Sequence, residues 1–191
     1  MSNLAIKGGP PIAPEGLKAK WPIFGDEEKR ALLEVLESGK WWRGAYKDPS
    51  ESKVGLFETE FCKYLGVKYG VAVTNGTAAI ELALKAAGVE AGDEVIVPAV
   101  TFIATATAVL AVNAVPIFVD IDPETYQIDP EKVEEAISEK TKAIVPVHYG
   151  GYPADMDRIM EIAEEHGLMV IEDCAEALSL IHISEPTRLG M

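Results

Sequence analysis

Hydrophobic residues in this chain fall into short runs that alternate, from residue 69 onward, with longer segments of helical periodicity. The short runs are rich in Val and Ile and lack regular polar alternation, which is typical of parallel strands covered by helices on both faces. Strands are predicted at 69–73, 94–97, 115–119, 143–147 and 168–172. Helices are predicted at 77–87, about 102–112, 130–137 and 156–166. The predicted fold class is therefore α/β, with a mostly parallel sheet flanked by helices.

The first third of the chain has a different pattern. Residues 1–22 are rich in Gly and Pro, which predicts an extended arm. Amphipathic helices are expected near 27–38 and 54–65, stopped by Gly39 and Gly66. The later helices carry caps of their own, Asp129 and Asp155 at two starts and Gly88 and Gly167 at two ends.

Composition excludes several classes of function. The chain has 191 residues, enough for one sizeable core, and 31 acidic against 17 basic residues leave a net charge of −14. Such an acidic surface repels phosphate backbones, which argues against nucleic-acid binding. No apolar run approaches the roughly 18 residues of a membrane span, and the N-terminus lacks a signal-peptide core. A cytoplasmic protein with no membrane partner is expected.

The positions of the cysteines and histidines predict neither disulfide bonds nor a metal site. Cys62 and Cys174 are far apart and fit no disulfide pattern, so reduced thiols are expected. The three histidines are scattered without metal-ligand spacing, so no metal is expected. His148, which follows the predicted strand 143–147, is interpreted as a hydrogen-bonded structural residue rather than a catalytic one.

Ligands of open parallel sheets gather at the carboxyl ends of the strands, so the residues just after each strand carry the functional signal. After 69–73 comes Thr74-Asn75-Gly76-Thr77, directly before a helix. The free N–H groups of that helix start, with the Thr77 hydroxyl, suit a phosphate, and Gly76 permits close approach. A tight turn capped by Asn75 or Thr77 explains the same residues equally well. Neither the Walker nor the G-x-G-x-x-G phosphate fingerprint is present.

Two further strand ends offer candidate residues. Phe102, after 94–97, would sit at the sheet edge, where its ring can stack on a flat heterocycle or simply pack at a helix start. Asp173 emerges from an apolar strand and would be costly there without a positive partner. A protonated pyridine nitrogen would serve, and a helix cap or a structural ion pair is the alternative. A metal bound by Glu172 and Asp173 is less favoured, because no further ligands follow.

Taken together, six motifs in order resemble the DegT/DnrJ/EryC1/StrS aminotransferases, which are fold-type-I enzymes using pyridoxal 5′-phosphate. The similarity runs from about Trp21 to Ala177. The motifs are VTNGTAA at 73–79, VPAVTFIAT at 97–105, DID at 120–122, PVH at 146–148, PADMD at 153–157 and IEDCAEA at 171–177. The stretch Trp41-Trp42-Arg43 is closer to the branch of 3-amino-5-hydroxybenzoate synthases and cyclitol aminotransferases. Exposed tryptophans before a loop usually have a role, so Trp42 and Arg43 are expected to contribute to a substrate wall and a subunit interface together, with a lid on the core as the alternative.

The resemblance implies roles for five residues. Gly76 and Thr77 would bind the cofactor phosphate, Phe102 would stack on its ring, and Asp173 would pair with the pyridine nitrogen. Glu176 would lie near the ring hydroxyl, although many members have Gln or His there. The implied reaction moves an amino group from glutamate or glutamine to a ketone on a sugar or cyclitol, in an enzyme that is a homodimer when intact.

No catalytic residue is assigned in this chain, because the family's cofactor-anchoring lysine lies in a later segment that the printed sequence lacks. The lysines here end at Lys142 and match no part of that motif. The chain is therefore expected to be an inactive N-terminal fragment of the large domain. Some relatives carry histidine at that position and act as dehydrases, so a sugar dehydrase is an alternative. A non-catalytic regulator that binds the cofactor or a nucleotide-sugar is another, and a generic nucleotide-binding α/β domain comes last.

The segment after Ala177 breaks the family pattern. Its residues LSLIHISEPTR at 178–188 resemble the translation of a sequencing-library adapter. The expected organisation is an arm at 1–22, a truncated cofactor-binding domain at 23–177 and a foreign tail at 178–191. In the family, the first strand pairs with a late strand beyond this point. A sheet of the other four strands is therefore expected, with a loosely held 69–73 segment and exposed edges prone to association.

Overall fold

The computed structural model describes residues 7, 9 and 22–178 of the chain. Contacts divide the chain into two compact units, Met1–Leu56 and Phe57–Met191, and each is described by itself. The boundary falls inside one helix, α2 (Lys53–Leu65). The predicted arm at 1–22 and foreign tail at 178–191 lie almost wholly outside the described residues and stay predictions.

The first unit contains the helix α1 (Asp26–Ser38) and two short 3-10 turns, η3 (Arg43–Ala45) and η4 (Pro49–Glu51). Three acidic residues lie in the first turn of α1, at the positive end of the helix dipole, where negative charge stabilises a helix. The helix stops at Gly39, whose φ of 66° is the left-handed conformation that glycine adopts without a Cβ clash. This agrees with the helix predicted at 27–38.

The second unit contains a four-stranded sheet in which every pairing is parallel. Its strands are β1 (Glu94–Pro98), β2 (Val115–Val119), β3 (Thr141–Ile144) and β4 (Met169–Val170). Their order across the sheet is β2-β1-β3-β4, so β1 is central and the chain crosses over between neighbours. The expected parallel α/β architecture is confirmed, with β3 and β4 shorter than the predicted runs.

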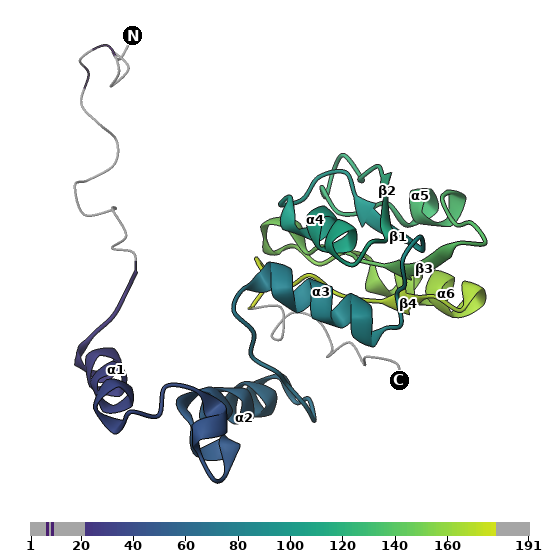
Figure 1. Ribbon diagram of the computed structural model, residues 1–191. Helices are drawn as coiled ribbons and strands as arrows, with labels where there is room; N and C mark the ends of the chain where they lie inside the picture. Colours follow the sequence, from purple (N-terminus) through teal and green to yellow (C-terminus); the bar gives the residue numbers. More distant parts are fainter. Residues whose placement is uncertain (1–6, 8, 10–21, 179–191) are drawn as a thin grey trace. The chain divides into compact units, whose positions relative to one another are not determined.

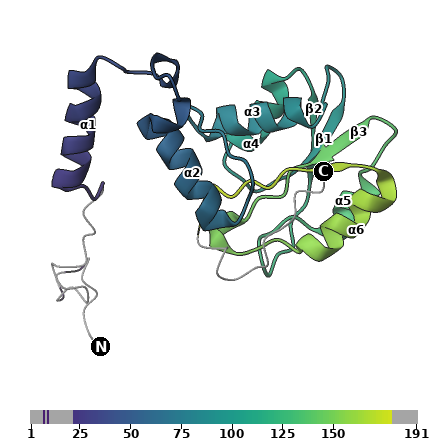
Figure 2. The same ribbon diagram turned by 90° about the horizontal axis from the view of Figure 1, so that it is seen from below.

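Helices cover both faces of this sheet, as Figures 1 and 2 show. On one face α3 (Gly76–Ala86) and α4 (Ala104–Ala111) pack on each other and on Val95 and Val97. On the other face α5 (Pro130–Glu135) and α6 (Met156–His166) pack around Ile96. Because neighbouring β1 residues point to opposite faces, both faces need apolar side chains, which explains the unbroken Val and Ile runs.

The segment 69–73 is the one predicted strand that the structure does not contain. These residues are not in a ladder with any described strand, and Val71 is 67% exposed. The Ala72 N–H instead donates to the Glu58 carboxylate of α2 at 2.9 Å. A strand needs a neighbour to satisfy its backbone groups, so apolar β-branched composition alone did not suffice here. The four-strand sheet and the unpaired 69–73 segment agree with the expectation drawn from the family topology.

Candidate functional site

The loop after β4 is tied to the end of β3 through the backbone of Asp173. The Asp173 N–H donates to the Pro146 carbonyl at 2.9 Å, and the Asp173 carbonyl accepts from the His148 N–H at 3.2 Å. This parallel bridge between Val147 and Asp173 extends the pairing of β3 and β4 past their named ends. Because successive side chains of an extended segment alternate, Asp173 and Glu172 point to opposite faces of the sheet.

The Asp173 carboxylate has a partner on each oxygen. Its Oδ2 accepts from the Thr105 hydroxyl at 2.9 Å, and its Oδ1 accepts from the Ala175 N–H at 3.2 Å. Thr105 is buried in the first turn of α4, so this bond joins the loop after β1 to the loop after β4. These two bonds fix the orientation of the carboxylate and leave each oxygen a lone pair for a further donor at the carboxyl edge of the sheet.

Phe102 is linked to this carboxylate through Thr105. Its carbonyl accepts from the Thr105 N–H at 3.2 Å, so Thr105 contacts both sequence-predicted residues. The Phe102 side chain is 76% exposed. At this exposure the ring is not packed into the core of the described residues, and it offers an apolar face for a flat partner, so its stacking role stays a prediction.

The start of α3 has both features that the sequence analysis weighed against each other. Asn75 is the N-cap, with its Oδ1 accepting from the Ala78 N–H at 2.9 Å. Among the described residues nothing accepts from the N–H groups of Gly76 and Thr77, and no acid lies in the first turn. A Cβ placed on Gly76 would meet nothing within 4 Å. The helix start is thus capped and still presents two donors to an anion.

The Glu176 side chain is hydrogen-bonded to the turn after β3. Its Oε2 accepts from the Gly150 N–H at 2.7 Å. Gly150 and Gly151 have φ of 64° and 78°, so this turn, η5 (Tyr149–Gly151), depends on glycine. The Glu176 carboxylate joins the loop after β4 to the turn after β3.

Gln127 is a structural residue of the same edge that sequence reasoning missed. It is 3% exposed, and its amide brackets Tyr149, donating to the Tyr149 carbonyl at 3.0 Å and accepting from the Tyr149 N–H at 3.1 Å. Its Nε2 also donates to the Thr125 carbonyl at 3.1 Å. The only sequence signal is a lone glutamine beside Ile128 before a helix cap, which is too common to interpret.

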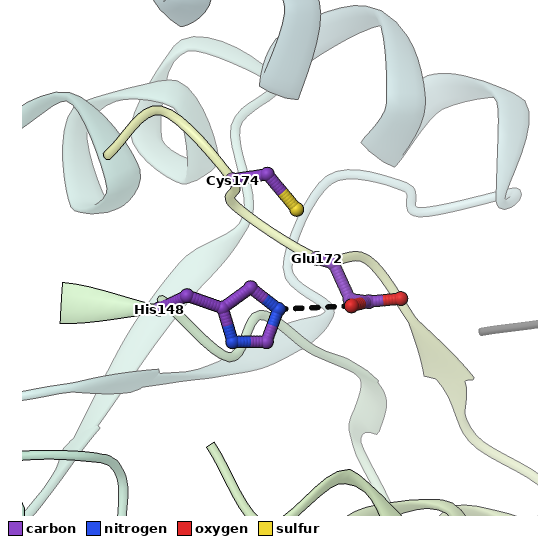
Figure 3. Close-up of side chains that lie close together, drawn as sticks. All are labelled: His148, Glu172 and Cys174. Carbon is purple, nitrogen blue, oxygen red and sulfur yellow. Dashed lines mark hydrogen bonds and ion pairs between the residues drawn. The ribbon is translucent and has the colours of Figure 1, made fainter. Parts of the chain in front are cut away.

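His148, Glu172 and Cys174 come together at the ends of β3 and β4, as Figure 3 shows. The imidazole is 2% exposed, with Nε2 at 2.9 Å from Glu172 Oε2. Its Nδ1 accepts from the Ala154 N–H at 3.1 Å. In a neutral imidazole one nitrogen accepts and the other carries the hydrogen, so Nε2 donates to Glu172. This agrees with the structural role predicted for His148.

The same three residues could be mistaken for a metal site, since their ligand atoms lie within 4.8 Å of one another. A metal on Nε2 would require the hydrogen to move to Nδ1, where it would oppose the Ala154 N–H. The tautomer thus argues against a metal at this cluster. Although Cys174 as a whole residue is exposed, burial of its thiol and the charges of Glu172 and Asp173 raise the pKa of Cys174 to about 11, which disfavours the thiolate that binds metals.

Trp42 and Arg43 belong to the first unit, and their predicted contribution to a substrate wall is not placed by the structure. Trp42 is exposed, and a Cβ on Gly44 would come within 2.0 Å of the Trp42 ring. A larger residue at position 44 would therefore require the exposed Trp42 ring to move. Arg43 begins η3, directly after Trp42.

The structure thus brings together Phe102 and Asp173 through Thr105, and Glu176 with the turn after β3. No hydrogen bond of the described residues joins Gly76 or Thr77 to that group, although α3 packs on α4, which carries Thr105. An open parallel sheet with polar and aromatic residues at its carboxyl edge defines an α/β domain of the class that binds ligands at that edge.

The chain belongs to the DegT/DnrJ/EryC1/StrS aminotransferase family, whose model matches residues 22–185. It is 45% identical over 176 residues to L-glutamine:scyllo-inosose aminotransferase of Streptomyces griseus, covering 92% of this chain and 41% of that protein. The crystal structure of 3-amino-5-hydroxybenzoic acid synthase superposes with a TM-score of 0.78 at 43% identity, covering 83% of this chain and 40% of that one. NtdA from Bacillus subtilis, solved with bound cofactor PMP, has a TM-score of 0.74 at 44% identity, covering 82% and 35%.

These similarities confirm the predicted family and its branch of cyclitol aminotransferases and aminohydroxybenzoate synthases. The chain spans about 41% of the length of the aminotransferase from Streptomyces griseus. The family match continues to residue 185, into the segment expected to be foreign, and no described residue tests that expectation. Among the described residues no helix has the length and apolar character that a bilayer crossing requires.

Proposed function

We propose that this chain is the cofactor-binding part of a pyridoxal-phosphate-dependent aminotransferase that transfers an amino group to a sugar or cyclitol ketone. One observation carries the proposal: Thr105, whose N–H donates to the Phe102 carbonyl, donates its hydroxyl to Asp173, so a carboxylate with two donors is linked to an exposed aromatic residue at the carboxyl edge of the sheet. The relatives named above are aminotransferases or a synthase of the same family, which favours this function over a sugar dehydrase or a regulator.

The described residues fit the cofactor's chemistry. A phosphate ester needs donors without nearby acids, which the N–H groups of Gly76 and Thr77 supply at the start of α3. A pyridine ring needs an apolar face, which Phe102 supplies. A protonated ring nitrogen needs a fixed carboxylate, which Asp173 supplies.

When bound, the cofactor supplies an electron sink that stabilises negative charge on the carbon next to the transferred nitrogen. Asp173 would hold the proton at the ring nitrogen, because its own oxygens already accept from Thr105 and Ala175. Phe102 would cover one ring face and exclude water there. Glu176, held by Gly150, would be positioned near the ring hydroxyl and would require that hydroxyl to donate, since an ionised carboxylate only accepts.

We propose further that the described residues bind the cofactor without moving the substrate proton. Lys142, the last lysine of the printed sequence, lies near the start of β3, whereas Asp173 pairs with Val147 beyond its end. At the rise of a parallel strand these positions are separated by roughly 16 Å. Lys142 is therefore badly placed to anchor the cofactor or to act as its base.

The partners of the whole protein are also proposals. Glutamine as amino donor and a cyclitol ketone as acceptor are supported by the name of the relative from Streptomyces griseus. We propose glutamate as an alternative amino donor and a keto-sugar as an alternative acceptor. Homodimer formation is proposed for the whole protein, and light scattering during size-exclusion chromatography tests it.

Titration with pyridoxamine 5′-phosphate, followed by calorimetry, tests the cofactor claim. This form of the cofactor cannot form an imine with surface lysines, so it reports the non-covalent site alone. We expect saturable binding, weakened at least about tenfold by Asp173→Asn, because the amide loses the charge that pairs with the ring nitrogen. Asp157→Asn, at an exposed position in the first turn of α6, is the matched control and should bind normally.

Two results would contradict the proposal. Absence of saturable binding by the folded wild-type chain would remove the cofactor claim. Equal affinity of the Asp173→Asn variant and the wild type would remove Asp173 from the site.

A further inference from the structure

We infer that Thr105, supported by Thr101, is a positioning residue that fixes the Asp173 carboxylate toward the ring nitrogen of the cofactor. The inference deepens the proposed function and rests on it. It assigns a role to a hydrogen-bonded chain of side chains that runs from the loop after β1 through the first turn of α4 to the loop after β4.

The hydrogen bonds that link Thr101, Thr105 and Asp173 have a defined direction. Thr105 Oγ1 is 2.9 Å from Asp173 Oδ2 and 2.9 Å from Thr101 Oγ1. A hydroxyl carries one hydrogen, and an ionised carboxylate can only accept. Thr105 therefore donates to Asp173, and Thr101 donates to Thr105. Such chains polarise each member, so the bond to Asp173 is strengthened by the hydroxyl behind it.

The burial and the direction of Thr105 set it apart from an ordinary helical threonine. Thr105 is 0% exposed in a helix whose other buried residues are Ala106, Ala108 and Val109. Thr hydroxyls in helices commonly bond a backbone carbonyl of the preceding turn, and Thr107 does so, with its Oγ1 at 3.3 Å from the Ala104 carbonyl. Thr105 instead reaches a carboxylate 68 residues away.

The consequence for Asp173 is both geometric and electrostatic. The Thr105 hydroxyl donates to one Asp173 oxygen and the Ala175 N–H donates to the other. Together these two bonds fix the plane of the carboxylate. The fixed oxygens would accept from a protonated ring nitrogen, which is the state in which the ring withdraws electrons. Without the Thr105 bond the carboxylate could rotate, and the ring nitrogen would lose the partner that stabilises its proton.

Nitrogen NMR of bound pyridoxamine 5′-phosphate, labelled with ¹⁵N in the ring, tests the inference without requiring turnover. The ¹⁵N shift reports whether the ring nitrogen is protonated, and calorimetry gives the affinity. We compare Thr105→Val, which keeps the volume and removes the donor, with Thr105→Ser, which keeps the donor. Thr107→Val, on the same helix, is the matched control, and circular dichroism verifies that each variant is folded.

The wild type, Thr105→Ser and Thr107→Val should share one ¹⁵N shift, typical of a protonated ring. Thr105→Val should move that shift toward the unprotonated form and weaken binding about tenfold. If Thr105→Val keeps the wild-type shift and affinity, the inference is overturned while the proposed function stands. Weaker binding with an unchanged shift in both Thr105 variants would also overturn it, by showing a packing role. No binding by the wild type would overturn the proposed function and this inference together.

Discussion

At the residue scale, the site depends on hydrogen bonds whose donors and acceptors can be assigned. His148 follows β3 and Asp173 follows β4, and a backbone bridge links these two strand ends. On one face Thr105 and Ala175 donate to Asp173, and on the other Ala154 and Glu172 fix the tautomer of His148. The buried side-chain polar atoms of the described residues are thus satisfied, and the exposed Phe102 ring and the N–H groups at the α3 start are available to a ligand.

The double role of the α3 start leads to a prediction for Asn75. Asn75→Asp keeps the side-chain oxygen that accepts from Ala78, so helix stability should change little. The added charge beside Gly76 and Thr77 should repel a phosphate and weaken pyridoxamine 5′-phosphate binding about tenfold. Asn75→Ser, a neutral cap, should keep both stability and affinity. Thermal melts and calorimetry separate the two effects, and an Asn75→Asp variant that binds like the wild type would contradict a phosphate at this turn.

Cys174 yields a prediction about pH. Its pKa is raised to about 11, first by burial of the thiol and then by Glu172 and Asp173. Only about a thousandth of the thiol is ionised at pH 8, and its alkylation rate should rise about tenfold per pH unit up to pH 10. Peptide mass spectrometry after iodoacetamide treatment measures this rate. Glu172→Gln removes one of the charges and should speed the reaction, whereas a plateau near pH 8.5 in the wild type would contradict the raised pKa.

At the scale of elements, sequence periodicity predicted α1, α3 and α6 within a residue or so, because caps punctuate them. Asp155 caps α6 through the Arg158 N–H at 3.2 Å, and Gly167 ends it with φ of 67°. The conformation of residues 69–73 could not be predicted from composition, because a strand forms only where a neighbouring strand bonds its backbone groups. The resemblance to a known topology supplied that information, and the local pattern did not.

Hydrogen exchange should show the consequence for the 69–73 segment. Amides of 69–73 should exchange at least about 100-fold faster than those of β1, because no strand ladder protects them. Ala72 should be the slowest of the five, since it donates to Glu58. Glu58→Ala should speed exchange at Ala72, whereas Glu60→Ala, an exposed position on the same helix, should not. Protection of 69–73 equal to that of β1 would contradict the unpaired segment.

At the scale of the whole molecule, the sequence predicted the sheet edge on which the candidate residues lie, but not how they are connected. Gly76, Phe102 and Asp173 follow from the rule that parallel strands present their carboxyl ends together. Thr105 and Gln127 do not follow, since a threonine in an apolar helix and a lone glutamine carry no distinctive pattern. Their roles depend on contacts between segments 68 and 22 residues apart, which only the folded chain reveals.

The net charge of −14 makes the local donors more important. A negatively charged chain repels a phosphate ester at long range, so binding must come from short-range contacts at the helix start and the strand ends. Binding that saturates in spite of this charge would therefore indicate a built site rather than general electrostatic attraction.

The most direct test of the central claim is an amide NMR map of the ¹⁵N-labelled chain during titration with pyridoxamine 5′-phosphate. The account predicts that the largest shifts lie at Gly76, Thr77, Phe102, Thr105 and Asp173. Inorganic phosphate alone should move only the first two of these residues, and pyridoxamine alone only the others. Shifts confined to other surfaces, or no shifts at all in the folded chain, would contradict a cofactor site at the carboxyl edge of this sheet.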